Sequence, residues 1–213
     1  PEEPVVLIVS GAKMETKVPV IKNFLDKGEH VLLGGCIANT FIAAQGHDIA
    51  ESKYEEEWVE EAQQIMLAGD TDENATIHVP HDVVVADTIS ADAQILDLPV
   101  EDIEGDMKIL DVGRVTVDEY IQIIEHAQTI IWNGPLGVHE FEPFARSSKR
   151  IADAVAAATK RGATTVIGGG DTIDFHERYG YPLDAYTFVS MGGGALMEFM
   201  SGKELPALRA LLS

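Results

Sequence analysis

The sequence has a single cysteine, few basic residues and no apolar run long enough to cross a membrane. Because Cys36 is alone, no disulfide can form within the chain, and a reducing cytoplasm is the compartment that this composition favours. Apolar stretches such as residues 4–9 are far shorter than the roughly 20 residues of a transmembrane helix. No stretch has the pattern of a signal peptide. We therefore expect a cytoplasmic protein that does not enter a membrane.

Basic residues are scarce, since 15 Lys and Arg stand against 36 Asp and Glu and the formal net charge is -21. Such a charge repels nucleic acid and anionic membrane surfaces, so neither is an expected partner. A nucleotide can still bind, because backbone dipoles and a few lysines act at short range. The acidic excess has two interpretations, a host that lives in high salt or a solvated acidic surface whose basic partner region is missing.

Several familiar motifs are absent. No G-x-G-x-x-G opens a helix and no G-x-x-x-x-G-K-[ST] occurs, which excludes the usual dinucleotide fingerprint and the P-loop. There is no G-x-S-x-G nucleophile turn. No two of the seven histidines have metal-ligand spacing together with a third acidic ligand, so zinc is not expected.

Glycine-rich turns are what the sequence has in abundance. Each of four turns follows an apolar segment and precedes a helical pattern, at residues 10–13, 34–36, 168–171 and 192–194. Glycine lets the backbone approach a ligand closely, and the helix behind the turn offers N–H groups and the positive end of its dipole to phosphate. Four such turns predict a nucleotide site, in which Asp171 is a candidate magnesium ligand.

Short apolar runs alternate with amphipathic stretches along most of the chain, a pattern typical of parallel sheets with helical crossovers. Strands are expected over 4–9, 30–33, 76–79, 82–86, 107–111, 128–132, 164–167 and 186–189. Helices are expected behind Lys13, over 36–45, 55–68, 116–126 and 144–160, from about Thr172, and over 195–200 and 204–212. Residues 88–106 show no periodicity and are expected to be irregular, and the acid-rich residues 51–61 suggest an exposed helix face that binds nothing.

The fold predicted from this order is a single α/β domain over residues 1–213, a doubly wound, Rossmann-like three-layer domain with a mostly parallel sheet. Ligands of such sheets bind at the carboxyl ends of the strands, where the four glycine turns lie. Lys13 and Lys17, four residues apart behind the first turn, can lie on one side of the helix and bind an anion there. The segment from Trp132 to Glu142 combines an amide, apolar residues and carboxylates, as adenosine requires, although Trp132 can equally belong to the core.

Six longer segments resemble phosphoglycerate kinases. They are Ser-Gly-Ala-Lys-Met-Glu-Thr-Lys-Val at 10–18, Gly-Gly-Cys-Ile-Ala-Asn-Thr-Phe at 34–41, Pro-His-Asp-Val-Val-Val-Ala-Asp at 80–87, Trp-Asn-Gly-Pro-Leu-Gly-Val-His-Glu-Phe-Glu-Pro-Phe at 132–144, Ile-Gly-Gly-Gly-Asp-Thr at 167–172 and Met-Gly-Gly-Gly-Ala-Leu-Met-Glu-Phe at 191–199. Their order and spacing match from Pro4 to Leu212. The resemblance covers only the C-terminal, nucleotide-binding half of the family. It implies a partner, the missing N-terminal domain with the 3-phosphoglycerate site, and we expect the chain to be a monomer.

The resemblance implies a role for each matching residue. The nucleotide, ATP or ADP, would be bound by Gly11, Ala12, Lys13, Gly34, Gly35, Gly113, Asn133, Pro135, Val138, Glu140, Gly169, Gly170, Asp171 and Thr172. Within that set Lys13 and Thr172 would bind phosphates, Glu140 the ribose hydroxyls and Asp171 the Mg²⁺ ion. Lys17 and the backbone of Gly192, Gly193 and Gly194 would act on the phosphoryl group in transfer.

The sequence also departs from the family's pattern. Ser10 replaces the first glycine of the first turn, where its Cβ would narrow the cleft, and Arg114 replaces a proline and would add charge beside the base pocket. Three functions remain open. One is the nucleotide-binding half of an ATP:3-phosphoglycerate phosphotransferase, which alone binds Mg-ADP or Mg-ATP without efficient turnover. Another is a stand-alone or diverged nucleotide-binding module without catalysis. The third is an acidic regulatory or assembly fragment that has lost nucleotide binding.

Overall fold

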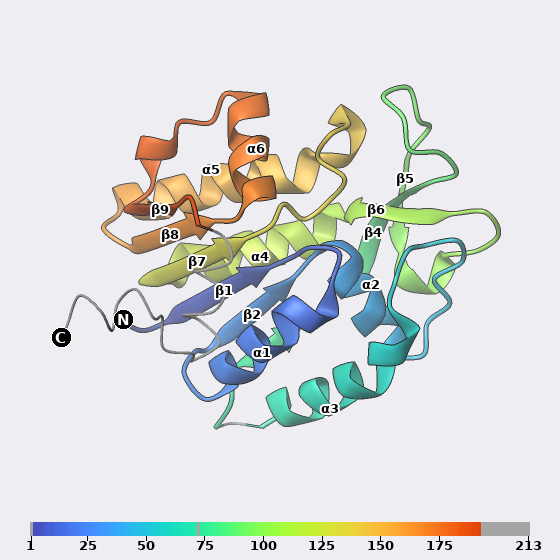
Figure 1. Ribbon diagram of the computed structural model, residues 1–213, viewed down its shortest axis with the longest axis horizontal. Helices are drawn as coiled ribbons and strands as arrows, with labels where there is room; N and C mark the ends of the chain where they lie inside the picture. Colours follow the sequence, from blue (N-terminus) through green and yellow to red (C-terminus); the bar gives the residue numbers. More distant parts are fainter. Residues whose placement is uncertain (1, 72, 193–213) are drawn as a thin grey trace.

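The computed structural model describes residues 2–71 and 73–192 (Figure 1). The helices expected over 195–200 and 204–212 lie outside the described residues, as do Gly193 and Gly194. Among the described residues, no helix is both long and apolar enough to cross a lipid bilayer.

The centre of the fold is a six-stranded, wholly parallel sheet with the order β3-β2-β1-β7-β8-β9. Its strands are β3 Thr76–His78, β2 His30–Leu33, β1 Val5–Val9, β7 Thr129–Asn133, β8 Thr164–Gly168 and β9 Phe188–Ser190. The central β1 is apolar at every position and buried along its whole length, as a parallel strand covered on both faces should be. The parallel sheet predicted from the sequence is confirmed.

Helices cover both faces of this sheet, so the doubly wound α/β fold is confirmed as well (Figure 1). On one face lie α1 Met14–Leu25, α2 Gly35–Ala44 and α3 Val59–Gly69, and on the other lie α4 Arg114–His126, α5 Arg146–Lys160 and α6 Gly170–Tyr179. Each face of the sheet has its own hydrophobic core, and alternate residues of β1 point into one or the other. Leu7 and Val9 pack with α1–α3, whereas Val6 and Ile8 pack with α4–α6. Within the described part of the chain, four short 3₁₀ helices connect elements, η1 Glu56–Trp58, η2 Val100–Asp102, η3 Glu142–Phe144 and η4 Leu183–Ala185.

A second, antiparallel sheet has the order β5-β4-β6 and consists of β5 Leu96–Pro99, β4 Asp82–Ala86 and β6 Lys108–Val112. It packs against Ile42 of α2. The expectation that residues 88–106 are irregular was wrong for 96–102, which form β5 and η2. The strand is hard to detect because it lies at the sheet edge, where Leu96 is 55% exposed and the burial contrast between its residues is weak.

Helix α4 begins at Arg114, two residues before the predicted start, because Asp82 of β4 caps it. The buried Asp82 carboxylate accepts hydrogen bonds from the Val115 N–H at 2.8 Å and the Thr116 N–H at 2.7 Å, and the Thr116 hydroxyl donates to it at 2.5 Å. A carboxylate bound to the first N–H groups of a helix also complements the helix dipole. Asp82 therefore joins the small sheet to α4.

The order of the parallel strands reverses between β1 and β7, which are neighbours in the sheet but far apart in sequence. Val9 is paired with Asn133, and the Ser10 N–H donates to the Asn133 carbonyl at 2.9 Å. In open α/β sheets such a reversal leaves a crevice at the carboxyl ends of the two strands, where ligands bind. A ligand site is therefore expected beside the segments that follow Val9 and Asn133.

Candidate functional site

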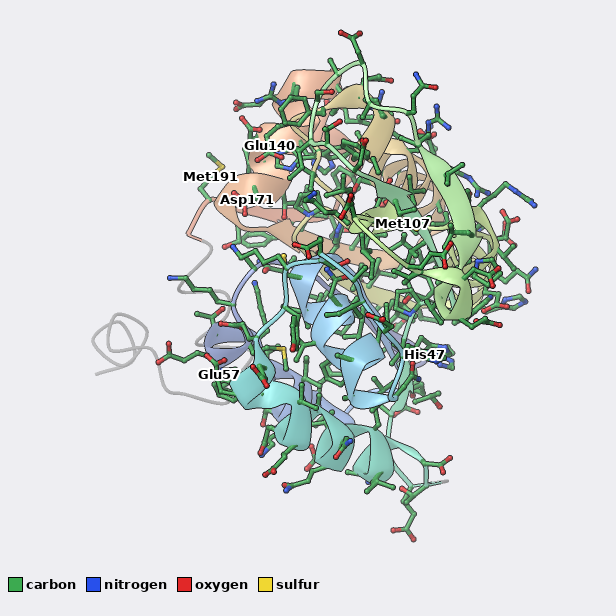
Figure 2. All side chains as sticks on the ribbon, turned by 90° about the vertical axis from the view of Figure 1, so that its right-hand side faces the viewer. His47, Glu57, Met107, Glu140, Asp171 and Met191 are labelled. Atoms are coloured by element: carbon green, nitrogen blue, oxygen red, sulfur yellow. The ribbon has the colours of Figure 1, made fainter. Side chains whose placement is uncertain are left out.

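A cleft of about 310 Å³ opens at this reversal point. Its lining comes from the turn after β1, the first turns of α2, the loop after β7, the start of α6 and the small sheet. Figure 2 shows two of the lining carboxylates, Glu140 and Asp171, near each other on one side of the molecule. The crevice expected from the fold is therefore a real cavity.

Ser10 forms part of the cleft wall and is 1% exposed. Its hydroxyl donates to the Pro135 carbonyl at 2.7 Å and so connects the turn after β1 to the loop after β7. A Cβ on Gly35 would lie 2.6 Å from this hydroxyl, and one on Gly134 would lie 2.6 Å from the Ser10 carbonyl. The two glycines thus provide the space that Ser10 occupies at this crossing.

Lys17 reaches from α1 to the sheet, where its ammonium donates to the Asn133 side-chain oxygen. Burial lowers the pKa of the Lys17 ammonium to about 8, and the charge of Asp171 acts in the opposite direction. The Asn133 amide nitrogen in turn donates to the Gly168 carbonyl at 2.8 Å. One contact chain therefore links a partly buried cation to the ends of β7 and β8.

The N-terminus of α6 lies beside this cation. Gly169 is its N-cap with a φ of 102°, a conformation that side chains disfavour, and as a glycine it has no side chain with which to cap the helix. In α2, by contrast, the Gly35 and Ile37 N–H groups already donate to the Leu136 and Gly11 carbonyls. These two N–H groups at the start of α2 are therefore already engaged and are not available to a phosphate.

Apolar residues line the side of the cleft that the small sheet, α2 and the loop after β7 provide. They include Ile42, Val83, Ile109, Leu110 and Val138. A flat apolar ring can lie against this wall while its charged part extends toward Asp171 and α6. Such a division between an apolar and a polar region is what a nucleotide requires.

The residues predicted from the sequence fall into three groups. Those that line the cleft are Gly11, Ala12, Gly35, Pro135, Val138, Glu140 and Asp171. Those that do not line it but lie on elements bordering it are Lys17, Gly34, Asn133, Gly169, Gly170 and Thr172. Lys13 and Gly113 do not line it either, but each directly follows a lining residue, Ala12 and Val112, and Gly192 does not line it.

Three of these positions have geometries that the sequence did not indicate. The Thr172 hydroxyl is buried, donates to the Gly168 carbonyl and accepts from the Gly134 N–H, both at 2.8 Å. Gly113 lies against Asp82, whose side chain a Cβ would approach to 2.3 Å. Lys13 is exposed and is the N-cap residue of α1, one residue before the helix begins.

Two other expectations also need correction. Arg114 does not line the cleft and instead lies 3.3 Å from Asp118 on the surface of α4. Residues 51–61 are not simply an exposed helix face, because α3 begins only at Val59 and Lys53 lines the cleft. The backbone of Lys53 is fixed there by the buried Asn39, whose amide donates to the Lys53 carbonyl at 2.9 Å.

Trp132, which the sequence left open between the site and the core, belongs to the core, where it is fully buried.

The sequence analysis missed Asn39, Lys53, Asp111 and His139 as cleft residues. Asn39 could have been found, because it lies one helical turn behind Cys36 on the same face of α2. Asp111 is fully buried and accepts a 3.0 Å hydrogen bond from the Ser147 N–H. Burial raises its pKa to about 7 in spite of the hydrogen bonds from Ser147.

Among residues 2–71 and 73–192, no group of three or more His, Cys, Asp and Glu residues is arranged to hold a metal ion.

Comparison with known proteins identifies the family. The sequence pattern of the family described as Phosphoglycerate kinase matches residues 1–203. The chain belongs to the phosphoglycerate kinase family. Phosphoglycerate kinases of Chloroflexus aurantiacus and Zymomonas mobilis are 43% identical over 211 residues and 42% identical over 212 residues. Each comparison covers 99% of this chain, but only 52% and 53% of the relative.

Solved phosphoglycerate kinases have the same fold. The structure from Coxiella burnetii matches with a TM-score of 0.92 at 39% identity and covers 100% of this chain and 53% of its own. The structure from Pyrococcus horikoshii OT3 matches with a TM-score of 0.82 at 30% identity and covers 99% and 52%. The chain thus spans about half the length of these family members.

Proposed function

We propose that this chain is the nucleotide-binding half of a phosphoglycerate kinase, an ATP:3-phosphoglycerate phosphotransferase of glycolysis. In this proposal residues 1–213 form one domain that binds Mg-ADP or Mg-ATP as a cytoplasmic monomer. The acceptor, 3-phosphoglycerate, is bound by the half that the chain lacks. The observation that carries the proposal is the cleft at the β1–β7 reversal, where Lys17 and the α6 N-terminus adjoin one end and an apolar wall forms another side.

The residues at the polar end suit the phosphates. Lys17 compensates the charge of the transferring phosphoryl group, and Lys13 approaches the phosphates from the exposed turn. In this proposal the N–H groups that follow Gly169, at the start of α6, bind the same charge, and the backbone of Gly192 acts on it too. Phosphoryl transfer depends mainly on such positioning and charge compensation, since the protein supplies little covalent chemistry.

Magnesium is the cofactor implied by this chemistry, and Asp171 is the residue that would hold it. Its carboxylate is exposed, lines the cleft and lies in the first turn of α6. One carboxylate suffices, because Mg²⁺ commonly keeps several waters and takes its other ligands from phosphate oxygens. When bound, the ion neutralises phosphate charge. Asp171 orients it, and Glu140 accepts hydrogen bonds from the ribose hydroxyls.

Calorimetric titration of this chain with Mg-ADP tests the proposal. We expect saturable binding to one site. Lys17→Met should weaken binding by about 10-fold or more, because a hydrogen bond to a charged group contributes about 1.5–3 kcal/mol. The matched control is Lys22→Met, which removes the same charge from the same helix but disrupts a surface contact with Glu61. No heat with about 1 mM Mg-ADP, or equal losses in the two variants, would contradict the proposal.

The pH dependence of Mg-ADP affinity provides a second test. Since the pKa of Lys17 is about 8 in the free protein, its ammonium is lost as the pH rises above that value. Phosphate favours the charged form, so affinity should stay level up to about pH 8 and then fall by up to about 10-fold per pH unit. Lys17→Arg keeps its charge throughout and should remove this decline. A parallel decline in both proteins would show that another group titrates.

A further inference from the structure

Lys53 is the one lysine or arginine among the described residues that line the cleft. It is exposed, and within residues 2–71 and 73–192 its ammonium forms no ion pair or hydrogen bond. Burial raises the pKa of the Cys36 thiol in the cleft wall, and the charge of Lys53 is the main influence that opposes this rise. The ammonium therefore lies close enough to the cleft to act on a group inside it.

The segment that carries Lys53 is fixed on the apolar side of the cleft. The Ser52 hydroxyl accepts a hydrogen bond from the Ile109 N–H of β6 at 2.9 Å, and the Lys53 carbonyl accepts one from Asn39 of α2 at 2.9 Å. Ile109 is itself part of the apolar wall. Lys53 is thus attached to the two elements that provide this wall.

Lys53 is also separated from the polar end of the cleft. Two residues before it, the Glu51 N–H donates to the Met107 carbonyl at 3.0 Å. Figure 2 shows Met107 well apart from Glu140 and Asp171. In the proposed function Asp171 binds Mg²⁺ and Glu140 the ribose, so the base extends away from them along the apolar wall. The ligand group nearest to Lys53 is therefore the base and not a phosphate.

Asn39 provides a hydrogen-bond acceptor beside this cation. It lines the cleft and is 2% exposed. Its amide nitrogen donates to the Lys53 carbonyl, whereas its Oδ1 atom accepts no hydrogen bond from the described residues. Since no fully buried side-chain oxygen in the described part of the chain lacks a partner, this Oδ1 atom remains accessible. The site thus combines one charged donor with one acceptor, connected through a hydrogen bond.

This pair matches a purine with a keto group at C6. In guanine and hypoxanthine the O6 atom accepts a hydrogen bond and the neighbouring N1–H group donates one, so Lys53 and Asn39 can each bind one of them. Lysine pairs well with the O6 and N7 acceptors of guanine, whereas adenine has an amino group at C6 that repels an ammonium. Asparagine binds adenine with both its oxygen and its nitrogen, but the Asn39 nitrogen already binds Lys53.

We propose that Lys53 and Asn39 recognise the C6 position of the base and make the cleft prefer guanine and hypoxanthine nucleotides to adenine nucleotides. The inference rests on the proposed function, because it requires a nucleotide in the cleft with its base against the apolar wall. Adenine nucleotides still bind through that wall and through the groups at the polar end. The preference is therefore a ratio of affinities, which long-range charge effects on all three nucleotides leave unchanged.

The test compares calorimetric dissociation constants for Mg-ADP, Mg-GDP and Mg-IDP. The unaltered chain should bind Mg-GDP about fivefold or more tightly than Mg-ADP. Mg-IDP should bind within about threefold of Mg-GDP, because hypoxanthine has the same O6 and N1–H groups. Lys53→Met keeps the apolar stem and removes the ammonium, so the preference should disappear while Mg-ADP affinity changes by less than about threefold.

Two further variants make the outcome decisive. Lys53→Arg retains a cationic donor and should retain the preference. Lys22→Met removes a surface lysine that contacts Glu61, away from the cleft lining, and should leave the preference unchanged. If the chain binds none of the three nucleotides, the proposed function itself fails. If it binds Mg-ADP at least as tightly as Mg-GDP, or keeps its preference in Lys53→Met, the role of Lys53 is disproved and the proposed function stands.

Discussion

The chain of residues 1–213 is expected to make no measurable 1,3-bisphosphoglycerate from Mg-ATP and 3-phosphoglycerate. In our proposal the acceptor is bound by the other half of the enzyme, so this chain can hold only one of the two reactants. Holding both in line contributes about 7–11 kcal/mol in favourable intramolecular reactions. A coupled assay of 3-phosphoglycerate-dependent ATP consumption measures the rate, and robust turnover by the chain alone would contradict the proposal.

Joining the missing half to this chain should restore turnover, and Lys17 can then be tested as a catalytic residue. Lys17→Ala in the joined protein should lower kcat by about 100-fold or more, with a much smaller rise in the KM for nucleotide, because its charge is needed most as the phosphoryl group moves. Lys22→Ala is the matched control and should leave both constants nearly unchanged. An unaltered kcat for Lys17→Ala would remove Lys17 from the catalytic residues.

The largest expected effect on stability is that of Asp82→Ala. The substitution leaves the Val115 N–H, the Thr116 N–H and the Thr116 hydroxyl without their acceptor in a buried position. The free energy of unfolding should fall by about 3 kcal/mol, since hydrogen bonds to charged groups contribute about 1.5–3 kcal/mol and neighbouring ones are not additive. The midpoint of urea unfolding measures the loss.

Asp97→Ala is the control for this effect. Asp97 is exposed on β5 and accepts a hydrogen bond at 3.2 Å from the Arg114 N–H of the same helix end. Its removal should cost less than about 1 kcal/mol. Equal losses in the two variants would show that the charge at the start of α4, and not the buried hydrogen bonds of Asp82, stabilises this helix.

The parallel sheet could be predicted from the sequence because its local signals agree. The run of five apolar, mostly β-branched residues in β1 is typical of a strand covered on both faces, and a glycine turn marks its end. The small sheet gave weaker signals. Strand β5 pairs on one edge with β4, exposes most of its residues and ends at Pro99, so neither its periodicity nor its composition distinguishes it from a loop.

The candidate site was predictable where a motif lies directly after a strand. Gly11, Gly35, Pro135 and Asp171 line the cleft because the carboxyl ends of parallel strands meet at one edge of the sheet. Lys53 was not predictable, since it comes from an irregular segment among acidic residues and its place depends on the hydrogen bond from Asn39. The contact of His139 with Asp174 at 2.9 Å depends on how the loop after β7 packs on α6, and no local pattern records such a contact.

Alkylation of Cys36 tests the central claim most directly, because it reports whether nucleotide occupies this particular cleft. Cys36 is the only cysteine of the chain, lines the cleft and is partly exposed. Burial raises the pKa of its thiol, so the reaction should be followed in mildly alkaline solution, where more thiolate is present. Mg-ADP should slow the reaction in proportion to the fraction bound, with the dissociation constant found by calorimetry. An unchanged alkylation rate at a saturating concentration would contradict the account, since the nucleotide would then bind elsewhere.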